Sequence, residues 1–129
     1  METIMLKNLR VLYVEDDERT QELMCSIIGE EVEEFYQAFD GEDGLKKVQE
    51  YQPDVVLTDI TMPYLDGLSM AQKIKEQNPQ QLIFILSAFE DKSILKGAIS
   101  LGIKYFLPKP IDTDNLLLKL KEISKLKEV

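Results

Sequence analysis

Five short apolar runs, separated by longer segments with helical spacing, restrict what this chain can fold into more than any other feature. The runs are "LRVLYV" (9–14), "VEEFYQA" (32–38), "DVVLTD" (54–59), "LIFILS" (82–87) and "IKYFLP" (103–108). Between and after them, apolar residues recur three and four positions apart, as Leu116, Leu120 and Ile123 do in the last segment. Strand and helix therefore alternate five times, which predicts an α/β fold whose parallel sheet is covered on both faces.

The fourth run supports a doubly covered sheet, because "LIFIL" is apolar at every position instead of alternating. Right-handed crossovers favour the flavodoxin-like strand order 2-1-3-4-5 with five helices. The chain has 129 residues, 44% of them hydrophobic, which suits one domain of ordinary size. We therefore expect a single doubly wound domain over 1–129, with its core at about 9–126. Within it, Asp66-Gly67 marks a helix start, and Asp112 or Thr113 is expected to cap the last helix.

Polar side chains stand where the predicted strands end. Asp16 and Asp17 follow the first run, Asp59 closes the third, Ser87 closes the fourth, and Lys109 follows the fifth. In an open α/β sheet, ligands bind outside the carboxyl ends of the strands. Strands 1, 3, 4 and 5 are neighbours in the predicted order, so these side chains are expected to meet around one cleft.

The side chains expected there fit a divalent cation and a phosphoryl group. Clustered carboxylates repel each other by about 1–4 kcal/mol per pair at about 4 Å, and Mg²⁺ removes that penalty because it prefers oxygen ligands. Lys109 and Ser87 are not needed for a metal, yet they suit phosphoryl oxygens as a cation and as a hydrogen-bond donor. An aspartate can itself attack phosphorus and form an aspartyl phosphate.

Four motifs stand in order at four strand ends. With them the chain resembles the receiver domains of two-component response regulators, a family that includes chemotaxis regulators. The motifs are "VEDD", "LTDITMPYLDG", "LSA" and "FLPKP", and the resemblance runs from about Leu9 to Leu126. It implies that Asp59 is the phosphoacceptor for a sensor histidine kinase or a phosphotransfer protein. It also implies that Lys109 contacts the phosphoryl oxygens and that the Lys109–Pro110 bond is cis.

The resemblance implies a metal site. Asp16 and Asp17 would bind Mg²⁺, or Mn²⁺ in its place, together with Asp59 and the backbone carbonyl of Thr61. Taken alone, Asp17 is more readily explained as the cap of the first helix. Glu15 is interpreted as a solvated neighbour that deepens the negative field.

The resemblance also implies a switch. Ser87 would be drawn toward the phosphorylated aspartate, and Phe106 occupies the position of the switch aromatic, while Tyr105 points to the opposite face of the strand. Ser87 with Glu90 also fits a capping box for the fourth helix. The domain would catalyse only its own phosphorylation and dephosphorylation. It would then change the surface of the fourth helix, fifth strand and fifth helix for a downstream partner, an output domain or a phosphorylation-dependent dimer.

Composition excludes several other classes of function. A net charge of −9 with no basic stripe argues against direct binding to nucleic acid or to a membrane surface. The chain has no histidine, which excludes His-based catalysis and His-ligated metal sites. Cys25 is the single cysteine, so no internal disulfide forms, and its helical apolar surroundings predict a buried, inert thiol. With no signal peptide and no run long enough to span a membrane, the sequence predicts a cytoplasmic protein.

Three alternatives share parts of this pattern. A flavodoxin-type electron carrier has the same fold but needs a phosphate-cradling loop after the first strand, where "EDDERT" would repel phosphate. A haloacid-dehalogenase-type phosphatase needs a second acid two residues after the nucleophile, where this chain has Thr61. A receiver-like module that binds partners without phosphorylation remains open, although the complete set of acids and Lys109 argues against it.

Overall fold

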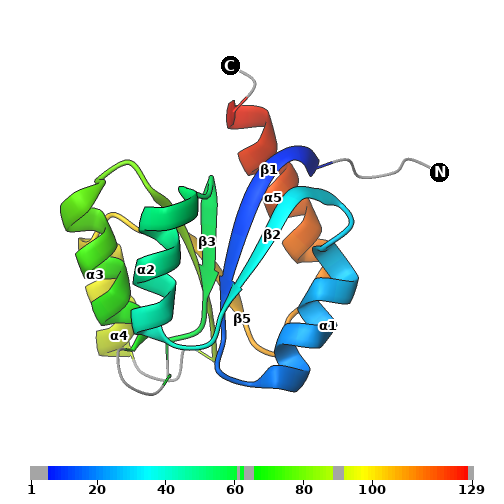
Figure 1. The fold of residues 1–129 in the computed structure, drawn as a ribbon. Helices are drawn as coiled ribbons and strands as arrows, with labels where there is room; N and C mark the ends of the chain where they lie inside the picture. Colours follow the sequence, from blue (N-terminus) through cyan, green and yellow to red (C-terminus); the bar gives the residue numbers. More distant parts are fainter. Residues whose placement is uncertain (1–5, 61, 63–65, 89–91, 128–129) are drawn as a thin grey trace.

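A five-stranded parallel sheet forms the centre of the structure, a computed structural model that describes residues 6–60, 62, 66–88 and 92–127. The elements in chain order are β1 (Leu6–Val14), α1 (Glu18–Ile28), β2 (Val32–Ala38), α2 (Gly41–Tyr51), β3 (Val55–Thr58), α3 (Gly67–Gln77), β4 (Leu82–Ser87), α4 (Lys92–Ser100), β5 (Tyr105–Pro108) and α5 (Thr113–Lys127). The strand order is β2-β1-β3-β4-β5, with every neighbouring pair parallel (Figure 1). The predicted flavodoxin-like architecture and strand order are confirmed.

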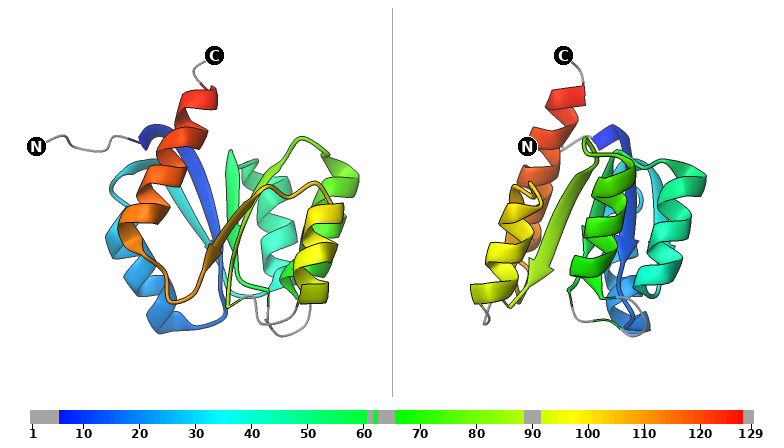
Figure 2. Two further views of the ribbon diagram at one scale, coloured as in Figure 1. Left: turned by 180° about the vertical axis from the view of Figure 1, so that it is seen from behind. Right: turned by 90° about the vertical axis from the view of Figure 1, so that its left-hand side faces the viewer.

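The strands send alternate side chains into two separate apolar layers. On β1, Val11 and Tyr13 pack with residues of α1 and α5, whereas Leu12 and Val14 pack with residues of α2, α3 and α4. Figure 1 shows α2, α3 and α4 on one side of the sheet, and in the right-hand view of Figure 2 these three helices lie in front of it. Because both faces are covered, β3 is buried at all four of its positions.

Aspartate side chains cap four of the helices. Each carboxylate accepts a hydrogen bond from a backbone N–H in the first turn, at Asp17, Asp40, Asp66 and Asp112. The helix start at Asp66-Gly67 is therefore confirmed, and Asp112 is the one of the two candidates that caps α5. In the described part of the chain, no helix has both the length and the apolar character needed to cross a bilayer.

The buried face of α1 does not include Cys25, which the sequence predicted to be buried. Gln21, Met24 and Ile28 are buried, whereas Leu23 is 60% exposed and Cys25 is exposed. The segment "LMCSII" carries more apolar residues than one helical face can bury, and spacings of three and four select the face of Met24 and Ile28. The prediction of a buried thiol is therefore wrong.

Candidate functional site

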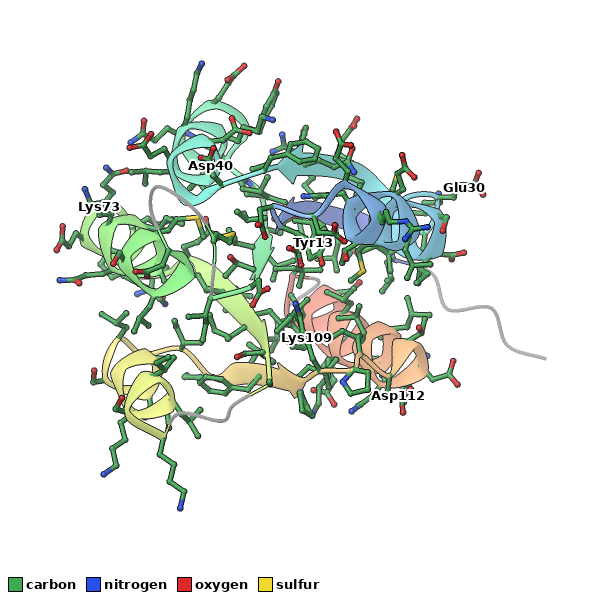
Figure 3. The ribbon with its side chains drawn as sticks, turned by 90° about the horizontal axis from the view of Figure 1, so that it is seen from below. Tyr13, Glu30, Asp40, Lys73, Lys109 and Asp112 are labelled. Atoms are coloured by element: carbon green, nitrogen blue, oxygen red, sulfur yellow. The ribbon has the colours of Figure 1, made fainter. Side chains whose placement is uncertain are left out.

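Asp59 stands one residue beyond β3, at the carboxyl edge of the sheet that Figure 3 views from below. Its Oδ1 accepts a hydrogen bond from the N–H of Ile60 at 2.7 Å, and its carbonyl oxygen accepts one from the Thr58 hydroxyl at 2.7 Å. The side chain is 17% exposed. The carboxylate is therefore held in one orientation and still reachable from solvent.

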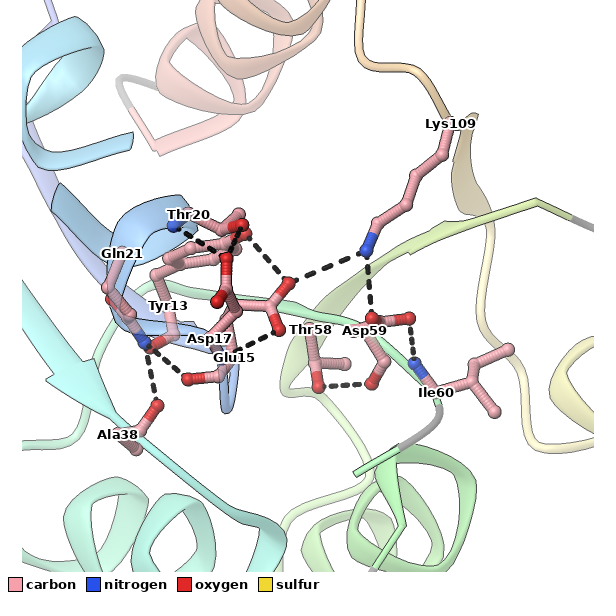
Figure 4. A network of polar contacts seen from close by, with 10 residues as sticks. All are labelled: Tyr13, Glu15, Asp17, Thr20, Gln21, Ala38, Thr58, Asp59, Ile60 and Lys109. Carbon is pink, nitrogen blue, oxygen red and sulfur yellow. Dashed lines mark hydrogen bonds and ion pairs between the residues drawn. The ribbon is translucent and has the colours of Figure 1, made fainter. Parts of the chain in front are cut away.

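Lys109 brings a positive charge from the end of β5 to this carboxylate. Its Nζ lies 2.8 Å from Asp59 Oδ2 and 3.4 Å from Glu15 Oε1 (Figure 4). Burial by itself would lower the pKa of Lys109, but the hydrogen bond to Asp59 and the charges of both carboxylates outweigh it and raise the pKa above that of an ordinary lysine. The ammonium group therefore stays charged at neutral pH. The structure brings Asp59 and Lys109 together, as expected from the strand order.

Glu15 is the third member of this cluster, and its position contradicts the expected solvated side chain. It is 3% exposed, its Oε2 accepts a hydrogen bond from the Asp17 N–H at 3.2 Å, and its Oε1 lies 3.5 Å from the Tyr13 hydroxyl. Burial and a hydrogen bond with Asp16 raise the pKa of Glu15, and Lys109 opposes only part of that rise. The pleat of β1 explains the burial, because Tyr13 and Glu15 are two positions apart and share the face covered by α1 and α5.

The two aspartates that follow Glu15 take different positions. Asp17 caps α1, where its Oδ2 accepts hydrogen bonds from the Thr20 N–H at 3.0 Å and the Thr20 hydroxyl at 2.5 Å. These bonds lower the pKa of Asp17, and the interpretation of this residue as a helix cap is confirmed. Asp16 is exposed and lies within hydrogen-bond reach of Glu15.

The predicted switch residues lie on the two strands nearest Lys109. Ser87 is the last residue of β4, and its carbonyl oxygen accepts a hydrogen bond from the Lys109 N–H at 2.9 Å. Phe106 packs against the layer of α2, α3 and α4, whereas Tyr105 packs against the layer of α1 and α5, so their opposite orientation is confirmed. The Lys109–Pro110 bond is cis, as expected. Glu90, the partner of Ser87 in the proposed capping box, lies outside the described residues.

Gly67 fixes the main chain at Asp59, a role that the sequence reading did not assign. Its N–H donates to the Ile60 carbonyl at 2.8 Å, and a Cβ at this position would lie 2.0 Å from the Asp59 carbonyl oxygen. Only glycine therefore allows the start of α3 to come this close to the end of β3.

Comparison with known proteins identifies the family to which a chain with these strand-end residues belongs. A family model described as the response regulator receiver domain matches residues 11–121. This chain belongs to that family. Receiver domains are signalling switches of two-component systems and generally are not metabolic enzymes. The match begins within β1 and ends within α5, and so includes every strand end described above.

Two sequence relatives of this receiver domain differ greatly in length. Chemotaxis protein CheY of Listeria monocytogenes is 31% identical over 118 residues, which cover 91% of this chain and 99% of that protein. Cyclic di-GMP phosphodiesterase of Thermotoga maritima is 32% identical over 113 residues, which cover 87% of this chain and 30% of that protein. The chain therefore spans nearly all of the first relative and less than a third of the second.

Solved structures give the same family likeness. The N-terminal domain of an uncharacterized protein from Wolinella succinogenes is 38% identical, with a TM-score of 0.88, and the match covers 92% of this chain and 96% of that one. The receiver domain of a Francisella response regulator is 29% identical, with a TM-score of 0.83, and the match covers 93% and 99% of the two chains.

The acidic residues of this receiver domain fit a hard divalent cation. Receiver domains generally bind Mg²⁺ at the phosphorylation site. Here Glu15 Oε1 and Asp59 Oδ2, which follow the ends of β1 and β3, both face the ammonium group of Lys109. Within the described residues, no three acidic side chains are close enough to form a metal site by themselves, but Mg²⁺ is usually held by one or two carboxylates, waters and substrate phosphates. Thr61, the predicted carbonyl ligand, lies outside the described residues.

Proposed function

We propose that this receiver domain accepts a phosphoryl group on Asp59 from the phosphohistidine of a sensor histidine kinase or a phosphotransfer protein, and acts as a cytoplasmic signalling switch. The proposal depends on the 2.8 Å contact between Lys109 Nζ and Asp59 Oδ2. A carboxylate can attack phosphorus when a fixed positive charge lies where negative charge develops, and here both groups are held at the exposed rim of the sheet.

The transfer is an exchange of one bond to phosphorus for another. A carboxylate oxygen of Asp59 attacks the phosphorus, and the new O–P bond forms as the N–P bond of the donor histidine breaks. The electron pair of the broken bond stays on the imidazole nitrogen. Lys109 lies beside the attacking carboxylate and would offset charge on the phosphoryl oxygens. Attack by water on the same phosphorus later releases phosphate and restores Asp59, so the domain acts only on its own phosphorylated state.

For the cation, we favour Asp59 together with Glu15 and Asp16, which would act directly or through bound waters, and the carbonyl of Thr61 as a further ligand. The sequence alone favoured Asp16 and Asp17, but the carboxylate of Asp17 is engaged by Thr20, whereas the carboxylate of Glu15 faces Lys109. A bound Mg²⁺ or Mn²⁺ would supply positive charge to the carboxylates and to the transferring phosphoryl oxygens.

The signal would leave through β4 and β5. Ser87 stands at the end of β4, and its carbonyl is tied to the Lys109 N–H, so a shift of Ser87 toward a phosphorylated Asp59 would act on both strand ends. Phe106 packs on the layer that contains α4, and its movement would change the surface of α4, β5 and α5. A downstream partner, an output domain or a second phosphorylated copy would read this change as a population shift between two states.

Labelling of an Asp59→Asn variant tests the proposal. The purified chain is incubated with Mg²⁺ and a ³²P-labelled small phosphodonor, acetyl phosphate, and is then exposed to acid or base. Wild type is expected to carry an acid-stable, base-labile label, and Asp59→Asn is expected to carry none. Asp66→Asn is the matched control, because asparagine still caps α3, and it should label like wild type.

Each other outcome has a defined meaning. Equal labelling of Asp59→Asn and wild type would refute Asp59 as the acceptor. An unlabelled wild type that also fails with phosphorylated histidine kinases would favour the alternative of a module that binds partners without phosphorylation.

A further inference from the structure

Gln21 is a polar side chain inside the apolar layer between α1 and the sheet. It is 1% exposed and shares the buried face of α1 with Met24 and Ile28. A buried amide is costly unless its hydrogen-bonding atoms find partners. At a helix position where an apolar residue would pack without that cost, a fully buried glutamine calls for a physical reason.

The contacts of Gln21 supply that reason. Its Nε2 donates to three backbone carbonyl oxygens, those of Tyr13 at 3.2 Å, Glu15 at 3.0 Å and Ala38 at 2.8 Å (Figure 4). An amide nitrogen carries two hydrogens, so at least one of them is shared between two carbonyls. Its Oε1 accepts a hydrogen bond from Gln37 Nε2 at 3.1 Å. The three carbonyls fix the orientation of the amide, because a flipped amide would turn its oxygen toward three other oxygens.

The three carbonyls lie where β1 and β2 come apart. The paired register of the two strands ends at Val14 and Ala38, and one further bond runs from the Glu15 N–H to the Ala38 carbonyl at 3.0 Å. Beyond this point the chain turns toward α1, and the Glu15 carbonyl is outside the sheet ladder. Gln21 therefore continues the strand pairing by one residue through a side chain from α1.

Glu15 and Asp16 project from the main chain that Gln21 holds. The Glu15 carboxylate reaches Lys109, and the exposed Asp16 follows it directly. We infer that Gln21 is a positioning residue for phosphoryl transfer: it fixes the backbone of Glu15 so that the acidic side chains face Asp59 and Lys109. This inference rests on the proposed function. It adds to the site a pair of amide side chains, Gln37 and Gln21, that link β2 to the acidic residues 15–17 between β1 and α1.

The test compares two buried glutamines that make equivalent bonds at opposite ends of the sheet. Gln81 is 6% exposed, and its Nε2 donates to the carbonyls of Pro53, Asp54 and Leu82 at 3.1, 3.3 and 3.2 Å, where β3 and β4 begin. Gln21→Met and Gln81→Met each remove an amide and keep side-chain length. Both variants should lose comparable stability in urea unfolding, so stability alone does not separate a positioning role from a structural one.

Two readouts separate the roles. Mg²⁺ affinity is measured by titration calorimetry on the unphosphorylated chain, and the phosphorylation rate is measured with acetyl phosphate. Loss of an outer-shell partner typically weakens metal binding about 10- to 100-fold, so Gln21→Met should lose about tenfold in both readouts, while Gln81→Met stays within about twofold of wild type. Gln37→Met removes the bonds that Gln37 Nε2 donates to the side-chain oxygen and the backbone carbonyl of Gln21, at 3.1 and 3.4 Å, and leaves the Gln21 amide itself in place. It should show a smaller loss in the same direction.

Wild-type Mg²⁺ affinity and phosphorylation rate in Gln21→Met would overturn the inference, as would equal losses in Gln81→Met. Should Gln21→Met fail to fold, Gln37→Met decides by the same two measurements. A wild type that binds no Mg²⁺ and accepts no phosphoryl group would instead refute the proposed function. Amide hydrogen exchange in metal-free buffer then tests Gln21 separately: faster exchange at Asp16 and Asp17 in Gln21→Met supports positioning, and unchanged exchange rejects it.

Discussion

Substitution of Gly67 by alanine should impair the site without touching any of its polar side chains. A Cβ at Gly67 would lie 2.0 Å from the Asp59 carbonyl oxygen and 3.0 Å from Ile60 Cα, and real Cβ atoms essentially never approach other atoms closer than 3.0 Å. The two segments must therefore separate by about 1.0 Å, the difference between 3.0 and 2.0 Å. Because the obstructing atoms are backbone, no change of rotamer relieves the contact.

Two opposing effects set the size of the change. Alanine favours a helix over glycine by about 0.8–1.0 kcal/mol, but overpacking of this kind costs about 1–3 kcal/mol. Gly67→Ala should therefore lower the free energy of unfolding by about 0–2 kcal/mol. A displacement of about 1 Å at a reacting group costs on the order of 10²-fold in rate, so phosphorylation of Asp59 should slow by about 10- to 100-fold.

Urea unfolding and the rate of phosphorylation by acetyl phosphate measure the two effects. Gly97→Ala in α4 is the matched control, because the nearest atom to its Cβ is Leu68 Cδ2 at 3.2 Å, the end of a flexible side chain. It should be neutral or stabilising by up to about 1 kcal/mol, with an unchanged rate. A Gly67→Ala protein as stable and as fast as Gly97→Ala would refute the argument from close approach.

Three further predictions concern the charges of the site. Lys109→Ala should slow phosphorylation by about 10²-fold and reduce phosphorylation-dependent partner binding more than Mg²⁺ affinity; equal losses in both would contradict its role at the phosphoryl group. Burial raises the pKa of Glu15 above 4.5 in the folded state, so wild type loses stability as the pH rises through that folded pKa. Glu15→Gln lacks this loss, so its free energy of unfolding relative to that of wild type should increase between pH 4 and pH 7 in metal-free urea unfolding. Identical pH profiles would reject the reasoning. Mg²⁺ at about 100 times its Kd should stabilise wild type by about 2.7 kcal/mol and Asp59→Asn by less; a thermal melt unchanged by millimolar Mg²⁺ would argue against a metal site.

Local patterns predicted the parts of the fold that depend on neighbours in the sequence. The alternation of apolar runs and helical segments was sufficient for the strand order, because right-handed crossovers leave few arrangements for five strands. Neighbouring residues on one strand point to opposite faces, so Tyr105 and Phe106 were assigned correctly. The meeting of Asp59 and Lys109 followed from that order, although 50 residues separate them.

The features that sequence reasoning missed depend on groups brought together by folding. The same alternation that separates Tyr105 from Phe106 places Glu15 on the face of Tyr13, whereas Glu15 was predicted to be a solvated neighbour of the metal-binding acids. Gln21 offered no such signal, since its burial depends on carbonyls that arrive from two strands. The start of β1 at Leu6, before the apolar run at 9–14, likewise depends on a bond from its N–H to the Glu31 carbonyl.

The division of the core into two layers has a consequence for how such a molecule can diversify. Glu15 and Gln21 belong to the side of α1 and α5, and Phe106 belongs to the side of α2, α3 and α4. Side chains on opposite sides of a continuous sheet do not compete for the same volume, so repacking around Phe106 leaves Gln21 undisturbed. The residues that position the phosphorylation site and the residue that transmits the switch can therefore mutate independently, provided that Asp59 is kept.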